Sequence, residues 1–328
     1  MGLPGRSPGR LRRLGAILCV AVAAAAPARA EPAFASGPVK IINAFPPGGP
    51  SDIISRLVAE KMQAALKQAV VVENRPGAGG DVAADQVAKA PADGSTILTG
   101  IDTTFTVNPS IYGAMPFKPE DLKPLMIMAS SGLTVAVHPS LGVKTLAELV
   151  AKGKTQTLTF SSGSNGSPGH LAAAILGDAA GIKVLHVPYK GNSPAVMALL
   201  TGEVQAGILA TPGLLPHVQS GKITALAVTS RQRSQVAPDL PTVAEAGMKE
   251  LEVEVLYVAM VPAATPEPVL AVLQKAMGDA LEQPAVKAQL ARLDLFVEAQ
   301  TGKAAQDRIA AQRSRYARII KATGMKIE

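Results

Sequence analysis

The sequence predicts an α/β protein of two lobes, each built on a mostly parallel sheet flanked by helices, with two strands crossing between the lobes. Apolar runs of strand length alternate with runs whose apolar residues recur at helical spacing, which is typical of sheets whose strands are joined by helices. Two long apolar runs, residues 125–137 and 253–261, are interpreted as the crossings. Once a leader is removed, about 300 residues remain, which is enough for two domains of about 130–150 residues.

The expected elements follow one another in this order along the chain. In the first lobe we expect strands at residues 39–45, 69–73 and 96–100 and helices at residues 53–66 and 81–89, with Ser51 or Asp52 capping the first helix. In the second lobe we expect helices at residues 145–152, 171–180 and 193–201 and strands at residues 157–160, 183–187, 204–209 and 223–228. After the return crossing, helices at residues 266–281 and 283–293 and a tail helix after Gly302 complete the first lobe. The predicted boundaries are residues 31–136 with 256–328 for the first lobe and residues 137–255 for the second.

The first thirty residues have the features of a signal peptide for export. Arginines precede an apolar run at residues 14–26, and Ala28-Arg29-Ala30 fits an A-x-A cleavage site before Glu31. The apolar run is well below the ~20 residues that a membrane-spanning helix needs. We therefore predict Sec-type export with cleavage after Ala30, in preference to a membrane anchor, a lipoprotein modified at Cys19, or twin-arginine export.

Removing the signal peptide changes what the charge and the cysteine content imply. The remaining 27 basic and 25 acidic residues lower the formal net charge from +7 to +2. The chain has no Trp and no basic cluster interleaved with aromatic residues, so we predict no nucleic-acid partner. Its single cysteine, Cys19, leaves with the signal peptide, which excludes disulfides and thiolate chemistry in the mature protein.

The sequence lacks the usual patterns of metal sites and of catalysis. None of the four histidines (138, 170, 186 and 217) lies two to five residues from another His or Cys, so no zinc pattern is present. The nucleophile elbow, the phosphate-binding loop of nucleotide hydrolases and the dinucleotide fingerprint are also absent. We predict no catalytic residue, no metal and no cofactor. The enzyme alternative is a hydrolase or isomerase that uses His170 with a nearby serine.

Two glycine-rich loops carry most of the functional information. Residues 45–52 (FPPGGPSD) and 161–170 (SSGSNGSPGH) each follow a predicted strand and lead into a predicted helix. Glycine lets the backbone approach a ligand closely, and Pro with Ser or Asp is typical of a helix N-terminus. Free N–H groups and the helix dipole both favour an anion there. Two such loops, far apart in the chain, suggest two lobes that close on a small carboxylate.

At these loops the chain resembles the Bug or TctC family, the periplasmic substrate-binding proteins of tripartite tricarboxylate transporters. The resemblance covers nearly all of the mature chain, and the ordered set of motifs is specific although each motif is weak alone. Besides the two loops, the matching segments are residues 72–80 (VENRPGAGG), 93–98 (DGSTIL), 108–112 (NPSIY), 166–171 (GSPGHL), 186–191 (HVPYKG), 226–230 (LAVTS) and 239–247 (DLPTVAEAG).

The resemblance implies a two-lobed periplasmic-binding-protein fold that closes on a small organic acid. It implies a periplasmic protein that serves integral-membrane transporter subunits, or presents its ligand to a sensor kinase. We predict that the protein is a monomer. The resemblance also implies that both loops bind one carboxylate, largely through main-chain N–H groups. The corresponding residues here are Phe45, Pro47, Gly48, Gly49, Ser51, Asp52, Ser162, Gly163, Asn165, Gly166 and Ser167.

Four further residues complete the expected ligand site. His170 begins the second helix and would either order its loop or touch the ligand, and Tyr189 lies in the HVPYKG motif. Thr103 and Thr104 could donate hydrogen bonds to a second polar end of the ligand.

The chain departs from the family pattern at two places where the far end of a ligand is expected. Leu209 and Ala210 align with a polar Asp or Asn pair of many relatives, and Leu256-Tyr257-Val258 replaces a Trp followed by an aromatic residue and Gly. An α-amino acid would need an acidic partner for its ammonium group. The sequence therefore favours an aromatic or short aliphatic monocarboxylate over citrate or glutamate.

Overall fold

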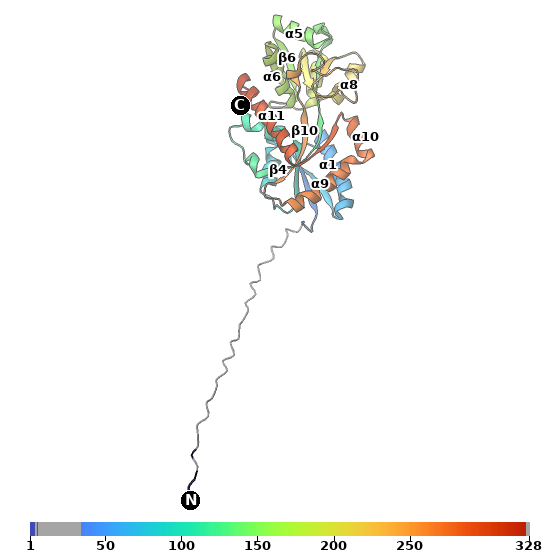
Figure 1. The fold of residues 1–328 in the computed structure, drawn as a ribbon. Helices are drawn as coiled ribbons and strands as arrows, with labels where there is room; N and C mark the ends of the chain where they lie inside the picture. Colours follow the sequence, from blue (N-terminus) through green and yellow to red (C-terminus); the bar gives the residue numbers. More distant parts are fainter. Residues whose placement is uncertain (4, 6–33, 326–328) are drawn as a thin grey trace. The chain divides into compact units, whose positions relative to one another are not determined.

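Two β-sheets organise the part of the chain that the computed structural model describes, residues 1–3, 5 and 34–325 (Figure 1). Residues Pro32–Glu328 form one unit of the chain. The predicted signal peptide falls almost entirely on residues outside the described part. Among the described residues, no helix combines the length and apolar character needed to cross a membrane.

The first sheet has six strands in the order β11-β4-β10-β3-β1-β2. Strands β1 to β4 run in one direction, and β10 and β11 run antiparallel to them. The strands are β1 (Val39–Asn43), β2 (Val70–Asn74), β3 (Thr96–Ile101), β4 (Leu122–Ser131), β10 (Val255–Pro262) and β11 (Phe296–Gln300). The helices of this lobe are α1 (Pro50–Leu66), α2 (Asp81–Ala88), α3 (Thr103–Thr106), α4 (Asn108–Ile111), α9 (Glu267–Glu282), α10 (Pro284–Arg292) and α11 (Gly302–Thr323).

Both faces of this sheet are covered by helices, which explains why its strands read as continuous apolar runs. Successive residues of a strand point to opposite faces. Ile41 accordingly packs in one buried cluster with residues of α1 and α9, and Ile42 packs in another with residues of α2 and α11. The core of the first lobe therefore has two layers, one on each side of the sheet.

The second sheet has five strands in the order β7-β6-β8-β5-β9, and only β5 runs against the others. Helix α6 packs on β6, β7 and β8, while α7 and α8 contribute to a separate buried cluster. The strands are β5 (Thr134–Val137), β6 (Leu158–Ser162), β7 (Val184–Pro188), β8 (Ala206–Leu209) and β9 (Thr224–Val228). The helices are α5 (Leu146–Thr155), α6 (Pro168–Ala180), α7 (Asn192–Thr201) and α8 (Thr211–Gln219).

The chain passes between the sheets through segments that lie side by side. The expected single strand over residues 125–137 is wrong: it is broken at Gly132 and Leu133, so that β4 belongs to the first sheet and β5 to the second. A Cβ on Gly132 would lie only 2.7 Å from the main-chain nitrogen of Ser230 in the returning segment. Glycine permits this close approach. The lobe boundaries at residues 136 and 256 stay a prediction.

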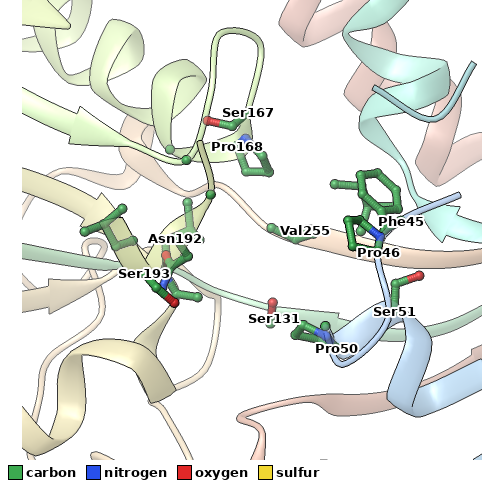
Figure 2. A pocket seen from close by; sticks show the side chains of 18 of the residues that line it. Phe45, Pro46, Pro50, Ser51, Ser131, Ser167, Pro168, Asn192, Ser193 and Val255 are labelled. Carbon is green, nitrogen blue, oxygen red and sulfur yellow. Dashed lines mark hydrogen bonds between the residues drawn. The ribbon is translucent and has the colours of Figure 1, made fainter. Parts of the chain in front are cut away.

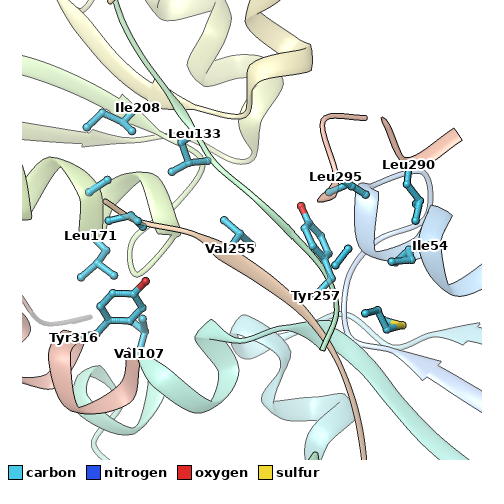
Figure 3. Close-up of a cluster of buried hydrophobic side chains, with 14 of the residues drawn as sticks. Ile54, Val107, Leu133, Leu171, Ile208, Val255, Tyr257, Leu290, Leu295 and Tyr316 are labelled. Atoms are coloured by element: carbon cyan, nitrogen blue, oxygen red, sulfur yellow. The ribbon is translucent and has the colours of Figure 1, made fainter. Parts of the chain in front are cut away.

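Helix α11 contacts both lobes. It packs on β4 and α3 of the first lobe and also on α6 of the second. Figure 3 shows Tyr316 of α11 near Leu171 of α6 and Val107, and all three belong to one buried cluster.

The alternation of strands and helices is confirmed, but α8 and β11 were not expected from the sequence. The segment of α8 contains two prolines and reads as a loop, whereas β11 is a half-buried edge strand.

Candidate ligand-binding site

A cavity of about 570 Å³ opens between residues of the two lobes (Figure 2). Its volume is typical of sites for small molecules. From the first lobe it is lined by Phe45, Pro46, Pro47, Gly48, Gly49, Pro50, Ser51, Ile101, Ser131, Val255 and Tyr257. From the crossing segment and the second lobe it is lined by Leu133, Gly163, Ser167, Pro168, Gly169, Gly191, Asn192, Ser193, Ile208, Leu209 and Ala210.

The loop after β1 leads to the cavity with the N-terminus of helix α1. The helix begins at Pro50, and Gly49 is its N-cap without a side-chain hydrogen bond. The expectation that Ser51 or Asp52 caps the helix is therefore wrong. The hydroxyl of Ser51 donates instead to Asn43 Oδ1 at 2.6 Å, because the loop folds back over the end of β1.

Asp52 is a buried residue that holds this loop together, and it does not line the cavity. Its carboxylate accepts hydrogen bonds from the N–H of Gly48 at 3.0 Å and from Asn74 at 2.8 Å, and it forms an ion pair with Arg56. Burial by itself raises the pKa of Asp52, but the hydrogen bonds from Arg56, Gly48 and Asn74 outweigh it and the pKa lies below its usual value.

The loop after β6 carries the N-terminus of helix α6 to the cavity. Ser167 is the N-cap, and its hydroxyl accepts from the N–H of His170, as the Ser-Pro pattern predicts. The N–H of Gly166 donates to His170 Nδ1 at 3.2 Å. Gly169 is packed so closely on β8 that a Cβ there would lie 2.3 Å from the carbonyl oxygen of Ile208.

His170 and His186 form a stacked pair behind this loop. Their ring centroids are 3.6 Å apart with an interplanar angle of 6°. His186 Nε2 lies 2.6 Å from the hydroxyl of Ser162, so the pair contacts the loop at both of its ends. Burial lowers the pKa of each histidine to about 4. Both rings line a separate cavity of about 260 Å³ beside α6 and not the cavity described above.

A third helix N-terminus lines the cavity, and the sequence reasoning missed it. Gly191 is the N-cap of α7 with φ of +111°, a conformation that favours glycine. Asn192 Oδ1 accepts from the N–H of Ala210 at 3.0 Å and so ties α7 to the start of α8. The signal was present in the sequence, because residues 191–194 (GNSP) contain the same Gly, Ser and Pro residues as the two recognised loops.

These three helices present main-chain donors to one space. In the described part of the chain, the N–H groups of Ser51, Gly169 and Ser193 have no hydrogen-bond partner, and all three residues line the cavity. N–H groups in a first helical turn have no partner within the helix, and the helix dipole adds positive potential there. An anion fits this arrangement.

Comparison with known proteins identifies the family. The model of the tripartite tricarboxylate transporter family receptor, TctC, matches residues 54–325. This chain belongs to the TctC family.

The receptor is similar to known relatives over almost its whole length. It is 33% identical to protein BugT of Bordetella pertussis over 325 residues, covering 97% of this chain and 99% of BugT. Among solved structures it is similar to the periplasmic binding protein BugD, with 32% identity and a TM-score of 0.75 over 90% of this chain and 100% of BugD. It is also similar to R. palustris Rpa4515 with adipate, with 28% identity and a TM-score of 0.78 over 89% of this chain and 99% of that chain.

Membership of this family makes the receptor a solute-binding protein of the periplasmic-binding-protein type rather than an enzyme. The predicted two-lobed α/β fold is thereby confirmed. Among the described residues, no group of three or more His, Cys, Asp or Glu side chains could hold a metal ion.

Some predicted site residues of the receptor lie away from the cavity. Thr104 donates to the carbonyl of Gly79, and Thr103 is buried at the start of the short helix α3. Ser162 and Gly166 are buried residues of the second loop, and Asn165 is exposed. Tyr189 donates to Glu203 at 2.8 Å. The residues of the predicted site that line the cavity are Phe45, Pro47, Gly48, Gly49, Ser51, Gly163 and Ser167.

The two departures from the family pattern lie at the cavity of the receptor. Leu209, Ala210 and Tyr257 line it, whereas Leu256 is fully buried on the opposite face of β10. The hydroxyl groups of Tyr257 and Ser131 lie 3.4 Å apart.

Proposed function

We propose that this receptor captures a small organic acid by closing its two lobes around it, and that main-chain N–H groups of α1, α6 and α7 hold the carboxylate. The observation that carries the proposal is the convergence of Ser51, Gly169 and Ser193, whose N–H groups lack partners in the described part of the chain and border one cavity. A related receptor, R. palustris Rpa4515, was solved with adipate, a carboxylate.

Main-chain donors suit this task because the loops that present them are held from behind. Asp52 fixes the loop before α1 through Gly48, and the stacked His170 and His186 contact the loop before α6. Preorganised donors lose little conformational freedom on binding. In this interpretation Asp52 and His170 position the loops and do not contact the ligand.

Thermal-shift measurements with small organic acids and their methyl esters test the carboxylate directly. We expect at least one acid to raise the melting temperature of the mature protein and its ester to have no effect. Equal stabilisation by an acid and its ester would contradict the proposal. Product formation during incubation would contradict binding without turnover.

Closure and oligomeric state are tested together by small-angle X-ray scattering. We expect a monomer whose radius of gyration falls when a stabilising acid saturates it, because ligand binding shifts the population toward the closed form. An unchanged radius at saturation would indicate a rigid, preformed site.

Export and partners follow from the same proposal. The mature protein isolated from the periplasm should begin at Glu31, after cleavage by the Sec pathway's signal peptidase. Crosslinking in membranes should capture the integral-membrane subunits of a tripartite transporter. Capture of a sensor kinase in their place would indicate that the receptor presents its ligand for signalling.

A further inference from the structure

The side chains of the cavity narrow the class of acid that it accepts, an inference that rests on the function proposed above. We propose that the ligand is a monocarboxylate whose body is uncharged and mainly apolar, such as an aromatic or medium-chain aliphatic acid. Among the described residues that line the cavity there is no Asp, Glu, Lys, Arg or His. The cavity therefore offers main-chain donors, a few hydroxyl and amide groups, and apolar walls.

An ammonium group would lack a partner in this cavity. Asp52 lies in the first loop and Asp102 follows Ile101, which lines the cavity, but the carboxylates of both are bonded elsewhere. Asp52 is bonded to Arg56 and Gly48, and Asp102 is 1% exposed and accepts from the N–H of Leu256 at 2.9 Å. A buried charge without a partner is strongly disfavoured. We therefore expect α-amino acids to be excluded.

A second carboxylate would find few additional donors. The N–H of Ala210 would extend the donor set to helix α8, but it is already bonded to Asn192 Oδ1. Beyond the donors of α1, α6 and α7, a second carboxylate would depend on the few hydroxyl and amide groups of the cavity, without help from a basic side chain.

The remaining walls are apolar and come from the crossing segments and from β8. Figure 3 shows Leu133 and Val255 on the crossing segments and Ile208 on β8 of the second lobe, and each of them lines the cavity. Tyr257 and Leu209 add further apolar surface. An apolar ligand body gains from burial against such walls, whereas a charged or strongly hydrated body loses its hydration there.

The test is a binding panel measured on the mature protein by thermal shift and calorimetry. The probes are benzoate and hexanoate, adipate and citrate, glutamate, and methyl benzoate. We expect benzoate or hexanoate, at about 100 times its dissociation constant, to raise the melting temperature by about 5 °C or more. Adipate, citrate and glutamate should bind roughly a hundredfold more weakly, because their additional charges would be buried without a side chain of opposite charge.

The results of this panel distinguish a failure of the proposed ligand class from a failure of the proposed carboxylate capture. Tight binding of adipate, citrate or glutamate with weak binding of both monocarboxylates would overturn the ligand class and leave carboxylate capture intact. Binding of methyl benzoate as tight as that of benzoate would overturn carboxylate capture itself. Failure of every probe to bind would overturn both.

A charge added at the cavity provides a second test. Ala210 is the N-cap of α8 without a side-chain hydrogen bond, so Ala210→Asp can cap the helix and should not unfold the protein. Its carboxylate would repel the bound acid, and we expect a loss of affinity of about tenfold or more for benzoate or hexanoate. The matched control is Gln283→Asp, which adds the same charge at the exposed N-cap of α10, away from the cavity. Equal affinities of the two variants would contradict the placement of the ligand at Ala210.

Discussion

Replacing Gly169 with alanine tests whether helix α6 presents a donor to the ligand. The added Cβ would lie 2.3 Å from the carbonyl oxygen of Ile208 and 3.2 Å from the Cβ of Ser162. Ordinary contacts are 3.4 Å or longer, so the start of α6 must move by about 1 Å. Gly169 has no positive φ, so the effect is steric and not due to backbone strain.

Two consequences follow from this displacement. Overpacking of this size costs about 1–3 kcal/mol of the free energy of unfolding. It lowers the melting temperature by roughly 2–4 °C per kcal/mol. A hydrogen bond to a charged group contributes about 1.5–3 kcal/mol, so its loss should weaken binding of the acid by roughly ten- to a hundredfold. Urea denaturation measures the first quantity and calorimetry with the preferred acid measures the second.

The control is Gly278→Ala in the interior of α9, where the new Cβ meets only Met126 Cε at 3.7 Å. This variant should be more stable by about 0.5–1 kcal/mol, because alanine loses less conformational entropy than glycine in a helix, and its affinity should be unchanged. If Gly169→Ala behaved like this control, α6 would not be held against β8 as described, and its role in binding would be refuted.

Three further predictions concern the groups that hold the two loops. Asp52→Asn removes charge-assisted hydrogen bonds and should lower the free energy of unfolding by about 2 kcal/mol, measured by urea denaturation. The pKa of Asp52 is lower in the folded than in the unfolded protein. In the wild type, its contribution to the free energy of unfolding is therefore present above the unfolded pKa and is lost as pH falls through the folded pKa. Gly48→Ala should cost about 1–2 kcal/mol, since Gly48 has φ of +82°. Gly49→Ala, with φ of −79°, should cost less, about 0.5–1 kcal/mol by the same measurement, because its backbone is unstrained and only the preference for glycine over alanine at an N-cap is lost. Burial holds the pKa of His170 and His186 at about 4. The free energy of unfolding should therefore fall by about 2–3 kcal/mol in total as pH is lowered from about 6.5 to 4, after allowing for the partial exposure of both rings. In a His170→Gln variant the free energy of unfolding should depend less steeply on pH.

The sequence predicted most elements of this fold because their apolar spacing is set by burial on both sides of a sheet. It did not predict α8, in which Pro212 and Pro216 favour a loop. Leu214 is 1% exposed in that helix, so packing on the second lobe outweighs the local preference. The break at Gly132 also escaped prediction, because only the returning segment explains it.

The candidate site was predictable where its chemistry is local and unpredictable where it depends on distant partners. Glycine, proline and serine in sequence were enough to indicate the helix N-termini of α1 and α6. The position of Ser51 depends on Asn43, and that of His170 depends on His186 from another strand. These partners are defined only by the folded chain, so the sequence could not separate residues that touch a ligand from residues that support the loops.

The contact of α11 with both lobes restricts how they can move past each other. Tyr316 is 1% exposed in the cluster that includes Leu171, so α11 holds α6 to the first lobe beside the crossing segments. If the second lobe rotates relative to the first while this contact is preserved, the rotation axis must lie close to the contact. Residues near the axis move least during closure. Helix α7 lies on the opposite face of the second sheet from α6 and therefore moves farther. We therefore expect a ligand to meet α1 and α6 first and α7 only on closure. Hydrogen exchange should show ligand-dependent protection at Ser193 and little change in α11; strong deprotection of α11 would contradict this order.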